Sequence, residues 1–512
     1  MFNYGIDHLT VSKVLSILNG NLQAQLNSEA IKKIIECHQL VLSIADGEEV
    51  VYGINTGFGP LCSSKITKEN TSILQRNLLL SHSVGVGDPI KKELSKLMLI
   101  LKVHSLAQGF SGISPQIIKR IIWHIEKDVI PIVPEQGSVG ASGDLAPLSH
   151  LFLPLINEGE VFYKGKISPT REVLSQFNLD PVELSPKAGL ALTNGTQFIL
   201  AHCVFLVDQM YSCLSHADLT TAMMIEGLLA SKMPFHRDLH RVRPFKGNVH
   251  VAERVNHFLN GSQMSESHLD CDRVQDPYSL RCVPQVHGSS RSAWLHLKEA
   301  VEIELNSVTD NPIVFENGLT ISGGNFHGQP LALPIDYACL ALSEIGNISD
   351  RRIYLSLEGK YPETPKLLME STGLNSGFMI LQYTSAALAS ENKNSCMPAS
   401  ADSIPTSLGQ EDHVSMGSIG CRKALKVASN IEKILAIEML CATQAMDFKR
   451  PLKSSDILDS VHKVIRSRIG HATEDRIFAE DIKEAISIIK SRELLAVSQF
   501  LDGKYCDVFE RY

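Results

Sequence analysis

The sequence predicts a mainly α-helical protein, because apolar side chains recur at helical spacing over long stretches. Residues three or four positions apart share one face of an α-helix, so such a stripe marks a buried face. Four stripes of this kind are present: Ile199, Cys203, Leu206, Met210 and Cys213; Trp294, Leu297, Val301, Leu305 and Val308; Ala428, Ile431, Leu435, Met439, Ala442 and Met446; and Phe478, Ile482, Ala485 and Ile489. The third stripe ends near Pro451, which cannot continue a helix.

The distribution of loops divides the chain into three predicted regions. Polar, glycine-rich segments are concentrated before about residue 195, and helical stripes dominate beyond it. We therefore expect a mixed N-terminal domain at 1–195, a long central helical bundle at 196–450 and a small helical C-terminal region at 451–512. The N-terminal domain carries the glycine-rich loop around residue 142.

Composition and termini exclude several classes of function. A net charge of −8 without a basic cluster argues against nucleic acid or an anionic membrane as the main partner. Met1–Thr10 lacks the features of a secretory signal, and we expect no run to reach the roughly 18 apolar residues that span a bilayer, so the predicted location is the cytoplasm. The eleven cysteines include no C-x-x-C pair, which predicts reduced core residues. No metal, NAD, ATP or pyridoxal phosphate is expected, because the corresponding motifs are missing.

The tripeptide Ala141-Ser142-Gly143, within EQGSVGASGDLAPLSH, can become an electrophile without any external cofactor. In a tightly bent loop the Gly143 amide nitrogen can attack the Ala141 carbonyl carbon, and loss of water from the ring and from Ser142 leaves an exocyclic methylidene. Gly143 has no Cβ to block this approach and tolerates strained dihedral angles. The product, a 4-methylideneimidazol-5-one, accepts an amine or an electron-rich ring. For an isolated Ala-Ser-Gly, a simple linking turn is the alternative interpretation.

The segment around the tripeptide resembles the signature of the aromatic amino-acid ammonia-lyases and aminomutases. Seven further segments are similar to the successive blocks of this family: YGINTGFG (Tyr52–Gly59), LLLSHSVGVG (Leu78–Gly87), GLALTNGTQ (Gly189–Gln197), QDPYSLRC (Gln275–Cys282), SGGNFHG (Ser322–Gly328), SGFMILQYTSAALASENK (Ser376–Lys393) and QEDHVSMG (Gln410–Gly417). The resemblance implies that the tripeptide forms the 4-methylideneimidazol-5-one group. It also implies a homotetramer in which each active site is assembled from more than one subunit.

Two of these blocks, SHSVGVG and QEDHVSM, resemble those of the histidine-specific members of the family. The resemblance therefore implies a carbon–nitrogen lyase that deaminates L-histidine to trans-urocanate and ammonia without oxidation, the first step of histidine degradation. A tyrosine or phenylalanine ammonia-lyase, or an aromatic 2,3-aminomutase, is the first alternative. A helical scaffold without catalysis is the second, and the presence of the tripeptide, Tyr52 and Arg281 argues against it.

Three aromatic residues match the family's catalytic and pocket positions. The reaction needs a base for a weakly acidic β proton, and the resemblance assigns this base to Tyr52, on a loop made flexible by glycines. A free phenol titrates at about 10, so a tyrosine base needs cationic or hydrogen-bond-donating neighbours. Tyr278 matches a further catalytic position and Phe326 a substrate-binding position. Without their blocks, packing in the core would be the simpler interpretation for each aromatic side chain.

Polar residues are expected to hold the substrate and the ring. Arg281 is the candidate for the substrate carboxylate, because a guanidinium offers a planar fork with two donors. A structural ion pair is the alternative for Arg281. Asn194 and Gln275 can donate amide hydrogen bonds to the carboxylate or to the oxygen of the prosthetic ring, where negative charge develops.

The imidazole of histidine would need polar partners inside the pocket. Glu411 and His82 fit this role, because a carboxylate can accept the imidazole N–H and would be costly to bury against phenylalanine. The resemblance also implies a catalytic role for Glu411, and Gln410, from the same block, is a further substrate-binding candidate. A structural ion pair that involves Glu411 is the alternative. Two positions depart from the family pattern: Gly409 stands where asparagine is expected, and Thr193 stands where an apolar residue is usual.

Overall fold

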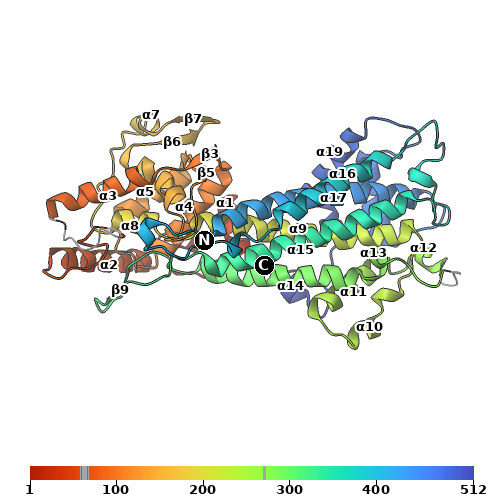
Figure 1. Cartoon of the computed structure of the whole chain (residues 1–512), viewed down its shortest axis with the longest axis horizontal. Coiled ribbons are helices and arrows are strands. Elements are labelled where there is room, and N and C mark those ends of the chain that lie inside the picture. The colour runs from red at the N-terminus through yellow and green to blue at the C-terminus, as the bar shows by residue number, and fades with distance from the viewer. Residues whose placement is uncertain (58, 60–65, 67, 269–272) are drawn as a thin grey trace. The chain divides into compact units, whose positions relative to one another are not determined.

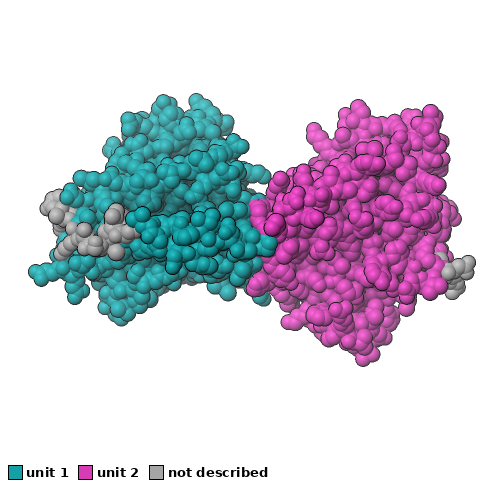
Figure 2. Space-filling model, viewed as in Figure 1, with its two compact units in different colours: residues 1–205, 298–335, 398–422 teal, residues 206–297, 336–397, 423–512 magenta. Residues whose placement is uncertain are grey.

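The computed structural model describes residues 1–57, 59, 66, 68–268 and 273–512. These residues form two compact units, each assembled from three chain segments. Unit 1 comprises 1–205, 298–335 and 398–422, and unit 2 comprises 206–297, 336–397 and 423–512 (Figure 2). The predicted regions 1–195, 196–450 and 451–512 are consecutive, whereas the two units interleave along the sequence. As a description of independently folding parts, the three regions remain a prediction.

Unit 1 combines helices with small sheets. Its helices and helical turns are α1 (Val11–Leu18), α2 (Ser28–Asp46), α3 (Lys68–His82), α4 (Lys92–Leu106), α5 (Pro115–Glu126), α6 (Leu145–Phe152), η2 (Leu153–Ile156), α7 (Thr170–Ser175), α8 (Ala188–Thr193), η5 (Ala399–Ala401) and η6 (Ser407–Gly409). Its strands are β1 (Phe2–Asn3), β2 (Ala24–Gln25), β3 (Val86–Pro89), β4 (Ile130–Pro131), β5 (Pro134–Gln136), β6 (Glu160–Tyr163), β7 (Lys166–Pro169), β8 (Ile313–Val314) and β9 (Thr320–Ile321). β1 pairs with β2 in parallel, and the pairs β3–β5, β4–β6, β6–β7 and β8–β9 are antiparallel.

Two helices of unit 1, α4 and α5, show how the sequence determines local structure. Ser114 caps α5 by accepting a hydrogen bond from the Ile117 backbone N–H at 3.4 Å, and Pro115 stands in the first turn, where no N–H partner is needed. α4 is buried on every face over residues 97–106. A helix that is apolar on all sides belongs in the interior, yet α4 carries Lys102 there, and that ammonium must find acceptors inside the protein.

Four long helices, α9 (Gln197–Gly227), α14 (Val283–Leu305), α15 (Gln329–Leu357) and α17 (Gly417–Asp447), run past the residue boundaries between the units (Figure 1). Within unit 2 they pack closely. The Trp294 Nε1–H of α14 donates to the Val207 carbonyl of α9 at 2.9 Å, and the Ser290 hydroxyl donates to the Ala341 carbonyl of α15 at 2.9 Å. A Cβ at Gly227 of α9 would stand 2.8 Å from that of Ala445 on α17, so glycine permits this approach.

Shorter helices complete unit 2. They are η3 (Met233–Phe235), α10 (Arg237–Arg241), α11 (Lys246–Leu259), α12 (Gln263–Glu266), α13 (Tyr278–Arg281), η4 (Lys366–Leu368), α16 (Met379–Ser395), α18 (Asp456–Arg468), α19 (Phe478–Ser491), α20 (Glu493–Val497) and α21 (Cys506–Phe509). Asp218 of α9 accepts hydrogen bonds from Arg254 of α11 and from His287 and Arg291 of α14. This buried charge cluster ties three helices together, because a buried carboxylate requires its partners.

The predicted mainly helical fold is confirmed. α9, α14, α17 and α19 cover the four apolar stripes, except that Val308 lies beyond the end of α14. The nine described cysteines are free thiols, and eight of them are buried. α9 and α15 have the length and mean hydropathy of a membrane span, although polar residues interrupt both, so that neither contains a run of 18 apolar residues. Most of each apolar window is buried, so these helices are apolar because they lie in the core.

Candidate active site

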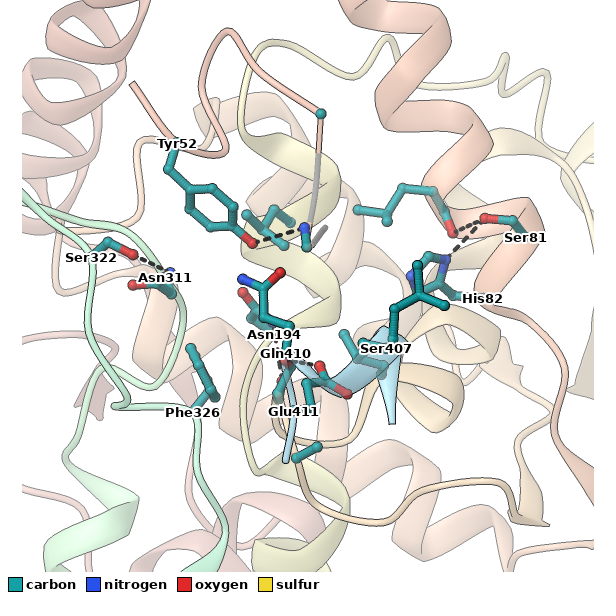
Figure 3. A pocket seen from close by; sticks show the side chains of 18 of the residues that line it. Tyr52, Ser81, His82, Asn194, Asn311, Ser322, Phe326, Ser407, Gln410 and Glu411 are labelled. Atoms are coloured by element: carbon teal, nitrogen blue, oxygen red, sulfur yellow. Dashed lines mark hydrogen bonds between the residues drawn. The ribbon is translucent and has the colours of Figure 1, made fainter. Parts of the chain in front are cut away.

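A cavity of about 1160 Å³ lies in unit 1, and chain segments far apart in the sequence form its walls (Figure 3). Its lining comes from Tyr52, Gly57 and Gly59, the C-terminal part of α3, Ala141 and Ser142, Leu190 and Asn194, the loop at 322–327 and the loop at 407–413. Small-molecule sites are typically concave and have volumes of about 300–1,000 Å³. The cavity is therefore large enough to hold an amino acid.

The tripeptide forms a tight bend at the wall of this cavity. Gly143 has a left-handed φ of +74°, and a Cβ there would stand 2.1 Å from the Gly195 carbonyl oxygen. No other residue fits this position, because the obstacle is backbone that cannot move aside. Ala141 is buried, and both Ala141 and Ser142 line the cavity. The residues present thus fit the predicted cyclisation, which requires a small residue, a hydroxyl and a glycine in a strained turn.

Asp144 anchors the loop on the side that follows the tripeptide. Its carboxylate accepts hydrogen bonds from the backbone N–H groups of Phe198 (3.1 Å) and Ile199 (3.0 Å), at the start of α9, and from the Ser138 hydroxyl (2.8 Å). Complete burial raises the pKa of Asp144 to about 7, although these hydrogen bonds oppose the shift. The Asp144 backbone N–H also donates to the Gly195 carbonyl at 2.7 Å. The bend is therefore held through both the side chain and the backbone.

Two side chains contact Ser142 itself. The Asn194 Nδ2 group donates to the Ser142 carbonyl oxygen at 3.0 Å. The Ser142 hydroxyl donates to Glu411 Oε1, and Glu411 Oε2 accepts from the Thr406 hydroxyl at 2.7 Å. The structure thus brings Asn194 and Glu411, which were predicted as site residues, to the tripeptide.

The predicted base and its loop lie across the cavity from Glu411. The Tyr52 hydroxyl accepts a 3.3 Å hydrogen bond from the Gly59 backbone N–H and lines the cavity (Figure 3). A backbone donor of this kind stabilises a phenolate. Gly53 has a φ of +70°, and a Cβ there would stand 2.6 Å from Leu190. The Tyr52 loop therefore contacts the helix that leads to Asn194.

His82 occupies the end of α3, where the helix reaches the cavity. One ring nitrogen of His82, Nδ1, lies 2.9 Å from the Ser81 hydroxyl. Burial lowers the pKa of the half-buried imidazole, while the charge of Glu411 acts in the opposite direction. Phe326 and the exposed Gln410 also line the cavity. His82, Phe326 and Gln410 therefore lie at the predicted site.

Three predicted site residues lie elsewhere in the chain. Gln275, Tyr278 and Arg281 belong to unit 2, and none is among the described residues that line the cavity. Gln275 is exposed, and the ring of Tyr278 is 69% exposed. The Arg281 guanidinium lies over this ring at 4.7 Å from its centroid. The substrate-carboxylate site at Arg281 therefore stays a prediction.

Several cavity residues escaped sequence reasoning. The Asn311 Nδ2 group donates to the Ser322 hydroxyl at 3.0 Å, and Asn311 Oδ1 accepts from the Gly323 N–H at 2.8 Å. His327 and His413 stack with parallel rings, and a His327 ring nitrogen lies 3.1 Å from the His413 carbonyl oxygen. His327 and His413 belong to two of the family blocks, SGGNFHG and QEDHVSMG, so their membership in these blocks could have marked them as candidate site residues. Asn311 lies outside those blocks, and no pattern distinguished it.

The two departures from the family pattern have different structural settings. Gly409 adopts a φ of +86° in open surroundings, a conformation that asparagine tolerates better than most residues. Glycine therefore fills the same backbone requirement as the expected asparagine. Thr193 is fully buried, and its hydroxyl donates to the Gly189 carbonyl one turn earlier at 3.1 Å. That internal hydrogen bond satisfies the polar atom in an otherwise apolar environment.

Comparison with known proteins agrees with this fold. The family model for aromatic amino acid lyase matches residues 9–467, and the chain belongs to that family. The histidine ammonia-lyase of Myxococcus xanthus is 43% identical over 491 residues, which cover 96% of this chain and 97% of that relative. The crystal structure of histidine ammonia-lyase from Trypanosoma cruzi has a TM-score of 0.91 and 38% identity and covers 99% of this chain and 97% of its own. The tyrosine aminomutase from Streptomyces globisporus has a TM-score of 0.90 and 33% identity, with 96% and 97% coverage.

Proposed function

We propose that this protein deaminates L-histidine to trans-urocanate and ammonia. The observation that carries the proposal is the position of Glu411, whose carboxylate lies at the tripeptide and faces a cavity that also contains His82. A carboxylate in this place suits an imidazole N–H and would be left without a donor by a phenyl ring. The full-length similarity to histidine ammonia-lyases supports the same substrate.

The tripeptide is proposed to become a 4-methylideneimidazol-5-one, for which the bend at Gly143 and the small Ala141 are suited. When present, this group supplies an electrophile that makes the amine a better leaving group. Its formation removes the Ser142 hydroxyl. Glu411 Oε1 would then lose the donor that it now binds and could accept a hydrogen bond from the substrate. Glu411 is thus proposed to serve substrate binding only after the tripeptide has matured.

The remaining residues are assigned roles from their positions. Tyr52 is proposed as the base that removes the β proton, since its oxygen lines the cavity and accepts from a backbone N–H. Asn194 is proposed to hold the Ser142 carbonyl oxygen through its Nδ2 group, so that negative charge on that oxygen is stabilised. His82 and Gln410 are proposed to contact the imidazole, and Phe326 to pack against the substrate.

A homotetramer is proposed to complete the site. Gln275, Tyr278 and Arg281 match family site positions, yet they belong to unit 2, outside the described cavity lining of their own chain. A second copy of the chain could supply them, and Arg281 would then bind the substrate carboxylate with two parallel hydrogen bonds. We further propose that the enzyme acts in the cytoplasm.

Specificity constants for L-histidine, L-tyrosine and L-phenylalanine test the proposed function. The purified protein should turn over histidine far better than the other two, measured as ultraviolet absorbance of each unsaturated product. Glu411→Gln keeps the side-chain shape but removes the charge, so it should lower kcat/KM for histidine by about 10-fold or more, the effect of losing a charged hydrogen bond. Equal turnover of tyrosine or phenylalanine would refute histidine as the substrate. β-Amino acid products would instead indicate an aminomutase.

A further inference from the structure

A buried lysine lies beneath the turn that carries Asn194. The Lys102 ammonium, on α4, donates to the Asn194 backbone carbonyl and lies 3.4 Å from the side-chain oxygen of Gln197. Lys102 is 1% exposed, and both of these acceptors are neutral. Burial lowers the pKa of Lys102 to about 7, against the opposing charges of Asp310 and Asp144. Burying an ammonium on neutral acceptors is unfavourable, so its place in the fold calls for an explanation.

The turn at 194–197 supports the tripeptide directly. Asn194 Nδ2 donates to the Ser142 carbonyl at 3.0 Å, and the Gly195 carbonyl accepts from the Asp144 N–H at 2.7 Å. Gly195 has a φ of +121°, a region in which glycine is free and other residues are strained. The backbone of Gly195 therefore does not by itself hold the turn in one conformation. Contacts from outside must do so.

Lys102 is placed to provide such a contact, because it bonds the first residue of the turn and lies beside the last. We infer that Lys102 is a positioning residue: its ammonium fixes the 194–197 turn so that the Asn194 amide points at the Ser142 carbonyl oxygen. The inference rests on the proposed function, in which this oxygen gains negative charge. A donor aimed at such an oxygen is worth about 10²- to 10³-fold in turnover in other enzymes, and a small misplacement forfeits much of it.

Lys449 provides a matched control. It is also 1% exposed, and its ammonium donates to the Pro362 carbonyl and, at 2.8 Å, to the Thr364 hydroxyl. It therefore holds neutral acceptors in the same way as Lys102. Lys449 belongs to unit 2 and is not among the described residues that line the cavity. Lys449→Met thus removes the same kind of buried charge without touching the tripeptide.

Lys102→Met and Lys449→Met are compared with the parent protein in three measurements. For L-histidine, kcat of Lys102→Met should fall by about 10²-fold with KM nearly unchanged, whereas Lys449→Met should keep the parent kcat. Mass spectrometry of the tripeptide-containing peptide shows if two water molecules have been lost, independently of activity. A missing water loss in Lys102→Met alone also supports the inference, because the turn would then be needed for cyclisation. Equal kcat and equal water loss in both variants would overturn it.

A double-mutant cycle with Asn194→Ala tests the route of the effect. If Lys102 acts through Asn194, Lys102→Met should cost little in kcat once Asn194 is already alanine. Additive losses would overturn the inference and mark Lys102 as a structural residue. Should Lys102→Met fail to fold, Lys102→Gln retains a neutral donor and serves in the same cycle. If the parent protein loses water from the tripeptide but does not turn over histidine, the proposed function is refuted and the inference about Lys102 is not. The water-loss comparison between the two variants then still tests Lys102.

Discussion

The tripeptide loop and the segment at 275–282 both carry predicted active-site residues, but the chain holds them differently. The tripeptide is bent around Gly143, bonded by Asn194 and anchored by the buried Asp144. By contrast, Tyr278 is 69% exposed, and the Arg281 guanidinium lies over its ring. The tripeptide is thus positioned by contacts within the chain, whereas Gln275 and Tyr278 are exposed. The proposed homotetramer would account for the difference if a second copy covered these residues.

Ser142→Ala is expected to have the largest effect, because it removes the hydroxyl whose elimination creates the methylidene. Turnover of histidine should fall to background. Alanine loses the hydrogen bond to Glu411 but fits the same loop, so the melting temperature should change little. Turnover above a tenth of the parent value, from a normally folded variant, would show that the tripeptide is not the source of the electrophile.

Tyr52→Phe should have the next largest effect. It keeps the ring and removes only the oxygen that accepts from the Gly59 N–H. Loss of a positioned base lowers kcat by about 10²- to 10⁴-fold, while KM should change much less. Steady-state kinetics with L-histidine separates the two parameters. A raised KM with an unchanged kcat would make Tyr52 a binding residue and direct attention to Glu411.

Arg281→Lys tests the segment at 275–282. Lysine keeps the charge but lacks the planar fork, so KM for histidine should rise by about 10-fold or more if Arg281 binds the carboxylate. Co-expression of Ser142→Ala chains with Arg281→Ala chains sharpens the comparison. If the two regions meet across subunits, mixed oligomers regain activity that neither variant has alone. Mixtures no more active than their separate components would place both regions in one chain's site.

Asp144→Asn should have the smallest effect, visible mainly in the pH dependence of stability. The folded-state pKa of Asp144 is raised to about 7, whereas an unfolded aspartate titrates at about 3.9, so the folded state binds the proton more tightly. The resulting stability is present below about pH 4 and is lost as the pH rises through about 7. The melting temperature of the parent, relative to Asp144→Asn, should therefore decline over this range. A constant difference between the two proteins would contradict the shift.

The sequence predicts most of the residues that line the cavity, but few of the buried residues that hold them in position. Periodic apolar residues locate the long helices, and the family blocks bring together Tyr52, His82, Asn194 and Glu411. These residues lie in recognisable motifs because chemistry restricts them. Lys102 lies in the apolar run LMLILKVHSL, and the only signal there is a single charge among residues expected to be buried. Its partners are about ninety positions away, and no spacing rule links them.

Assembly is a second limit of sequence reasoning. The block at 275–282 predicts site residues, yet a linear pattern does not say which copy of the chain they would serve. Their membership in unit 2 and the exposure of Tyr278 are features that only the structure reveals. Each unit is likewise assembled from three segments that are far apart in the sequence. Composition along the sequence does not reveal which of these segments pack together.

The contact between Gly143 and Gly195 limits how this enzyme can evolve. A Cβ at Gly143 would collide with the carbonyl oxygen, the carbonyl carbon and the backbone nitrogen of Gly195. The obstacle is therefore main chain and not a side chain. Where two side chains collide, a mutation in one can be compensated by a smaller neighbour. Here the neighbour is Gly195, which has no side chain that a mutation could make smaller. A library randomised at both positions should therefore contain glycine at residue 143 in every active clone. No substitution at residue 195 should permit a different residue at 143.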